Sequence, residues 1–257
     1  MTEIKPIRLA FAETKSVDQG SFSLQGAAYA SAAAKLRSAL ASAGPQGCAQ
    51  GGIADKLDLV DDFVHLCGQL DTDFGTDAAL PLADAENAVE HALQALAEIV
   101  AALDRFSLAE ERMAWQTVIL GIGLWAMRHQ LAIFWPEPIV NALAERANDT
   151  HTRQDTVATF ALMQGLIDHL APQFGMDLER SNPERPWRLL NLNFAITAIR
   201  TGDAEMMQFA FANLKNRMPQ ECPGFFAEAA SLAAGPGFPA PTRALIEAEL
   251  ARAAPLH

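Results

Sequence analysis

The sequence contains few cysteines and no cysteine motif. Its three cysteines, Cys48, Cys67 and Cys222, lie far apart, and no two of them form a CxxC pair. An odd number of scattered cysteines encodes neither a closed disulfide framework nor a zinc site. We therefore expect reduced thiols and a cytoplasmic protein.

Basic residues are also scarce. The chain of 257 residues has 19 Lys and Arg against 31 Asp and Glu, which gives a formal net charge of −12. A chain with this charge is repelled by the phosphates of nucleic acids and by anionic lipid headgroups. Neither nucleic acid nor a membrane surface is an expected partner.

No apolar run is long enough to cross a membrane. The most apolar stretch, residues 113–127, is shorter than the roughly 20 residues that a bilayer requires. It is closed by Arg112 on one side and by Arg128 and His129 on the other. A buried core helix is predicted there. The apolar stretch at residues 9–12 is too short for the core of a signal peptide.

Patterns typical of β-strands are missing as well. The chain has one tyrosine and few runs of β-branched residues, so no strands are expected beyond the N-terminal arm. Apolar residues instead recur every three or four positions, which is the spacing of one buried helix face. The clearest case has Ile53, Leu57, Val60 and Val64 on that face. The opposite face carries Asp55, Asp58, Asp61, Asp62 and His65.

The same periodicity predicts an all-α fold along most of the chain. Half of the residues are hydrophobic, which suffices for a substantial core. Ser107 and Glu110 have the spacing of a capping box, which predicts a helix start near residue 108. The predicted helices cover about residues 26–43, 53–69, 84–104, 108–128, 137–147, 153–170, 184–201, 203–217, 223–234 and 241–253.

The sequence predicts a mobile N-terminal arm followed by one domain. Residues 1–25 lack helical periodicity, and residues 26–257 are expected to form a single all-α domain. The glycine-rich stretch at residues 44–52 should break the first helix, because glycine readily leaves the helical conformation. That stretch and residues 171–183 are candidate boundaries within the domain.

Two segments of the chain share a pattern that suggests an internal repeat. A shift of 72 residues places Trp115 on Trp187 and Ile122 on Phe194. In the second copy, Gly202 is suited to end a helix and Asp203 to cap the next one. Pairs of helices repeated in this way stack into solenoids.

The second copy resembles a tetratricopeptide-like repeat, on the spacing of Trp187, Leu190 and Phe194, followed by Phe211 and a closing Pro219. The resemblance covers at most residues 111–253. The first helix is about four residues longer than that family's, and the small residues at the helix crossing stand elsewhere. The resemblance implies antiparallel helix pairs in an α-α superhelix, and a compact multi-helix bundle is the alternative.

The sequence contains no recognisable catalytic or cofactor-binding motif. No GxSxG is present, and Cys67 lies in an apolar stripe, where burial makes a thiol inert. Alternate carboxylates at Asp71, Asp73 and Asp77 resemble part of a calcium loop, but the glycine comes one place early and Leu82 stands where a glutamate is needed. Gly121 and Gly123 indicate close helix packing. No metal and no cofactor are predicted.

Four residues are candidates for binding. Trp135 lies in a proline-rich turn, where its ring could be exposed. Arg185, Trp187 and Arg188 lie at the end of the loop at residues 179–187. Together with Arg180, the two arginines could form a fork of guanidinium groups that holds a carboxylate or a phosphate. The competing interpretation is that these arginines form local salt bridges and that Trp187 packs at a helix start.

The leading functional hypothesis is a non-enzymatic scaffold or regulatory adaptor that binds a protein or peptide on a helical surface. The alternative is an enzyme or small-molecule binder with a pocket between helices, lined by Trp125, Met127 and His129 and gated by residues 171–186. A third hypothesis is a homo-oligomer held by spare apolar faces, since Phe209 lies away from the main stripe of its helix.

Overall fold

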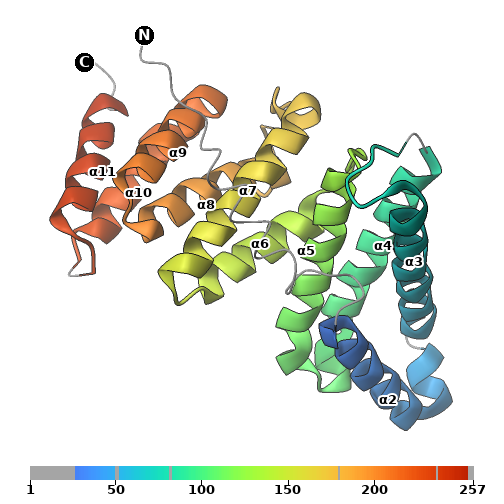
Figure 1. Ribbon diagram of the computed structural model, residues 1–257. Helices are drawn as coiled ribbons and strands as arrows, with labels where there is room; N and C mark the ends of the chain where they lie inside the picture. The colour runs from blue at the N-terminus through green and yellow to red at the C-terminus, as the bar shows by residue number, and fades with distance from the viewer. Residues whose placement is uncertain (1–26, 50–51, 81–82, 179, 236, 254–257) are drawn as a thin grey trace. The chain divides into compact units, whose positions relative to one another are not determined.

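The structure, a computed structural model, describes residues 27–49, 52–80, 83–178, 180–235 and 237–253 (Figure 1). Within these ranges the chain forms ten α-helices and three short 3-10 helices, and no strand. The predicted all-α fold is confirmed. The predicted N-terminal arm, residues 1–25, lies outside the described residues. Among the helices that are described, none has both the length and the apolar character needed to cross a bilayer.

The chain divides into two compact units, Met1–Arg146 and Ala147–His257. The division falls inside one helix and coincides with neither candidate boundary. In the first unit, α3 packs against α4, α4 against α5, and α2 against both α3 and α5. The helices of this unit are α2 (Ala27–Ala49), α3 (Ile53–Phe74), α4 (Ala83–Ala102), η1 (Leu103–Phe106), η2 (Ala109–Glu111), α5 (Arg112–Arg128) and most of α6 (Glu137–Asp149).

The second unit also packs neighbours in sequence against each other. Helix α7 packs against α8, α8 against α9, and α10 against α11, which also touches α9. After the end of α6, this unit contains α7 (Arg153–Phe174), α8 (Pro186–Thr201), α9 (Ala204–Arg217), η3 (Pro219–Glu221), α10 (Cys222–Ala233) and α11 (Ala240–Ala253).

The apolar stripe read from the sequence is the buried face of α3. Ile53, Leu57, Val60, Val64 and Cys67 are all buried. The aspartates of the opposite face are exposed or half-buried. Burying one such aliphatic side chain contributes about 1.5 to 3 kcal/mol, so this stripe explains why α3 packs on α4.

The turn between α8 and α9 forms as predicted. Gly202 adopts a left-handed conformation with φ of 66° and ends α8. The Asp203 carboxylate then accepts the backbone N–H groups of Glu205 and Met206, at 3.0 and 3.2 Å. These bonds satisfy two of the amides that an α-helix start leaves without partners.

Two predicted helix boundaries are wrong. Helix α2 continues to Ala49, beyond the break expected after residue 43, because glycine also adopts the helical conformation at modest cost. The capping box at Ser107 does not form. Ser107 is left-handed, with φ of 56°, and its N–H closes the 3-10 turn η1 on Asp104. An N-cap needs an extended residue, so α5 begins only at Arg112, after η2.

Candidate interaction sites

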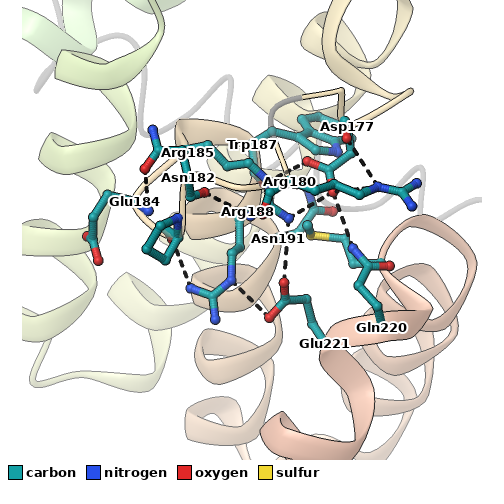
Figure 2. Close-up of polar contacts among 12 residues, drawn as sticks. Asp177, Arg180, Asn182, Glu184, Arg185, Trp187, Arg188, Asn191, Gln220 and Glu221 are labelled. Atoms are coloured by element: carbon teal, nitrogen blue, oxygen red, sulfur yellow. Dashed lines mark hydrogen bonds and ion pairs between the residues drawn. The ribbon is translucent and has the colours of Figure 1, made fainter.

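The loop between α7 and α8 is organised around a buried ion pair (Figure 2). Arg185 Nε lies 2.5 Å from Asp177 Oδ1, and Nη2 lies 2.8 Å from Oδ2. Asp177 is 4% exposed and Arg185 is 3% exposed. Gln220 of η3 donates to the same carboxylate at 3.2 Å. The loop is thereby tied both to the start of α8 and to η3.

Every N–H group of the Arg185 guanidinium has an acceptor. A guanidinium has five N–H groups. Besides the two bonds to Asp177, Nη1 donates to the carbonyls of Asn182 and Arg180, at 2.9 and 3.5 Å, and Nη2 faces Glu221 at 3.5 Å. The hydrogen bonds to Asp177 above all raise the pKa of Arg185, against the lowering effect of burial. Arg185 therefore stays charged and fully engaged inside the protein.

Arg188 is engaged in the same cluster. Its Nε lies 2.9 Å from Glu221 Oε2, and its Nη1 donates to the carbonyl of Pro183 at 3.1 Å. Glu221 thus joins Arg185 and Arg188, while Arg180 Nε faces Asp177 Oδ2 at 3.7 Å. All three arginines of the predicted fork form local salt bridges. A ligand carboxylate would have to displace these partners. An anion-binding role for these arginines stays a prediction.

Trp187 is buried in the first turn of α8, beside this cluster. Its indole Nε1 is buried without a hydrogen-bond acceptor among the described residues, and so is that of Trp115. These are the two tryptophans that the shift of 72 residues relates. Their shared environment is that of a core residue at the beginning of a helix.

The buried ion pair turns two apolar side chains toward solvent. Asp177 is left-handed, with φ of 48°, and its side chain points inward to Arg185. Its neighbours Met176 and Leu178 are 74% and 82% exposed. A non-glycine residue adopts this backbone conformation at a cost of about 1 kcal/mol or more, which the bonds to Arg185 offset.

A second ordered loop joins α5 to α6 in the first unit. Leu131 and Ile133 point inward and are buried. Glu86 and Glu90 of α4 accept the backbone N–H groups of the alternate residues, Ala132 at 3.0 Å and Phe134 at 2.8 Å. Because Glu86 and Glu90 are one helical turn apart, their carboxylates fix the loop at two points along an extended stretch.

This loop presents two aromatic side chains. Phe134 is 58% exposed. Trp135 is half-buried, and its indole N–H donates to Glu137 Oε2 at 3.3 Å. Trp135 thus lies in the loop between α5 and α6, and its role in binding stays a prediction. Sequence reasoning missed Phe134, although the alternation of Leu131 and Ile133 with it already indicates an outward side chain.

The first unit also contains a buried histidine bonded on both sides. His129 is fully buried, with Nδ1 2.7 Å from the carbonyl of Ala78 and Nε2 2.8 Å from Asp71 Oδ1. Trp125 donates its indole N–H to the same oxygen at 2.9 Å. Both ring nitrogens are therefore engaged by groups of the protein itself.

The carboxylate of Asp71 is thus used inside the protein. Helix α3 extends to Phe74, so Asp71 and Asp73 belong to a helix instead of a loop. In the part of the chain that the structure describes, no group of three His, Cys, Asp or Glu residues could hold a metal ion.

No protein-family model, no curated protein and no solved structure matches this chain. Of the four candidate residues, Arg185 and Arg188 meet at Glu221, Trp187 is a core residue beside them, and Trp135 lies on the separate α5–α6 loop of the first unit. Phe209, the basis of the homo-oligomer hypothesis, packs edge-on against Phe194 with ring centroids 6.3 Å apart.

Proposed function

We propose that this protein is a non-enzymatic interaction scaffold, an adaptor that binds a protein or peptide partner through the α5–α6 loop. The observation that carries the proposal is the exposure of Phe134 beside the half-buried Trp135 on a backbone fixed by Glu86 and Glu90. Aromatic side chains are enriched among the residues that dominate binding energy at protein interfaces.

The fixed backbone matters as much as the aromatic rings. A mobile loop must be ordered when a partner binds, and this ordering reduces the affinity. Here the two glutamates already hold the N–H groups of Ala132 and Phe134, and Ile133 is buried between them. A partner would therefore meet a loop backbone that is already ordered.

We also propose that α8 and α9 of the second unit form a tetratricopeptide-like helix pair. Trp187, Leu190 and Phe194 all lie on the buried side of α8, and Phe211 is buried in α9. The two helices are joined by the compact turn at Gly202 and Asp203. These features support a helix pair of that kind, whose known use in other proteins is to present a binding surface.

Selection from a displayed random peptide library tests the proposal. Peptides recovered on the native protein should bind the Phe134→Ser variant at least about tenfold more weakly. Met113→Ser is the matched control, because Met113 is also a large exposed apolar residue and lies at the other end of α5. Circular dichroism and the melting temperature establish that both variants fold. Recovered peptides that bind the Phe134→Ser variant as tightly as the native protein would overturn the proposal.

A further inference from the structure

Three carboxylates contact the α5–α6 loop, which presents the exposed Phe134 and the half-buried Trp135. Glu86 and Glu90 reach the loop from α4, and Glu137 follows it in the first turn of α6. Each uses one oxygen to accept an N–H group, from Ala132, Phe134 and the Trp135 indole respectively. A carboxylate has a second oxygen with further acceptor capacity.

These three charges are not neutralised by cations of the described chain. Among the described residues of the first unit, the ion pairs involve other carboxylates, namely Asp61, Asp71, Glu98, Asp104 and Glu111. Glu86, Glu90 and Glu137 form hydrogen bonds to neutral N–H groups only, so far as the described residues extend. Within the described ranges, Phe134 and Trp135 are therefore bordered by carboxylates that form no ion pair, in a chain whose formal net charge is −12.

We infer that the partner segment carries lysine or arginine next to its apolar anchor, so that the apolar side chain packs on Phe134 and the cation lies between Glu90 and Glu137. This inference rests on the proposed function and specifies its partner. A partner with acidic residues there would be repelled.

The chemistry of the site allows the charge to be removed without disturbing the loop. Glu90→Gln keeps a side-chain oxygen that can accept the Phe134 amide, and Glu137→Gln keeps one for the Trp135 indole. The double variant Glu90→Gln/Glu137→Gln therefore changes charge while the hydrogen bonds persist. Glu110→Gln is the matched control, since Glu110 is exposed and precedes the opposite end of α5.

The test is the charge composition of peptides selected on the native protein, the double variant and the control. We expect peptides that depend on Phe134 to be enriched in Lys and Arg over Asp and Glu when selected on the native protein and on Glu110→Gln. On the double variant this enrichment should vanish. Peptides from the native selection should bind the double variant about three- to tenfold more weakly.

The possible outcomes separate this inference from the proposed function. Phe134-dependent peptides without a basic bias, or a bias that persists on the double variant, would overturn the inference and leave the scaffold proposal standing. An equal loss of binding with Glu110→Gln would also overturn it, because the attraction would then come from the net charge of the chain. Selected peptides that ignore the Phe134→Ser change would overturn both.

Discussion

Asp177 and Arg185 form a two-point ion pair inside the second unit, with N–O distances of 2.5 and 2.8 Å and almost no exposure to water. Bringing two charges out of water is expensive, so such a pair does not by itself guarantee stability. Replacing only one of the two residues should lower the stability most, because the charge of the other residue is left buried without its partner. The pair also holds the left-handed turn that exposes Met176 and Leu178.

This relationship predicts strong coupling between the two residues. Arg185→Met and Asp177→Asn should each lower the free energy of unfolding by about 3 kcal/mol. The double variant should lose about 2 kcal/mol less than the sum of the two. Arg180→Met should cost under about 1 kcal/mol, since most of its side chain is exposed. Urea denaturation measures all four variants, and additive losses in the double variant would show that the pair is not coupled.

Asp71 is predicted to be structural. Asp71→Ala leaves the indole N–H of Trp125 and Nε2 of His129 buried without their acceptor, which should lower the free energy of unfolding by about 2 to 4 kcal/mol. Asp73 lies in the same last turn of α3 but is exposed, so Asp73→Ala should change stability by less than about 0.5 kcal/mol. Thermal unfolding compares the two. Equal melting temperatures would contradict the role assigned to Asp71.

Tyr29 provides a prediction about pH. Burial first, and the charge of Asp58 to a smaller extent, raise the pKa of Tyr29 from 10.0 to about 12, against a lowering effect of Arg37. The unfolded chain therefore releases the Tyr29 proton at lower pH than the folded protein does. The resulting contribution to stability is complete below pH 10 and is lost as the pH rises through about 12.

The measurement is direct because the chain has one tyrosine. The ultraviolet absorbance of tyrosinate should rise with a midpoint near pH 12 in the folded protein and near 10 in urea. Far-ultraviolet circular dichroism at each pH shows whether the fold persists. Across this range, Tyr29→Phe should reduce the pH dependence of the free energy of unfolding. The same midpoint with and without urea would contradict the burial of the hydroxyl.

The helices could be predicted because their cause is local. The three-or-four spacing of Ile53, Leu57 and Val60 fixes the buried face of α3 whatever lies opposite. Gly202 likewise ends α8 through its own left-handed conformation, and Asp203 caps α9 with its own side chain. Ser107 shows the limit of local patterns, since its capping-box spacing is overridden by the 3-10 turn that ends on it.

The site residues depended on partners that are distant in sequence. In the sequence, the last turn of α3 resembles an acidic loop. In the structure, its Asp71 bonds to His129, which is 58 residues away in the chain. The order of the α5–α6 loop depends on Glu86 and Glu90, which are 46 and 44 residues from the amides they accept. The sequence showed the cluster of arginines, but it did not show that Asp177 and Glu221 are their partners. Sequence spacing alone does not identify such pairs.

Gly123 and Ile139 offer a test of helix packing in which the effect should change sign. Alanine in a helix is favoured over glycine by roughly 0.5 to 1 kcal/mol, but a Cβ at Gly123 would lie 2.9 Å from Ile139 Cδ1 and 3.1 Å from its Cγ2. Overpacking costs about 1 to 3 kcal/mol, so Gly123→Ala should destabilise the native protein. In an Ile139→Ala background, where those atoms are gone, the same change should stabilise the protein.

Gly224→Ala is the control. Its Cβ meets nothing within 4 Å, so this variant should stabilise the protein without a second change. Urea denaturation measures the change in the free energy of unfolding that Gly123→Ala causes in each background. If this change has the same sign in both, the contact with Ile139 does not explain the glycine at this position.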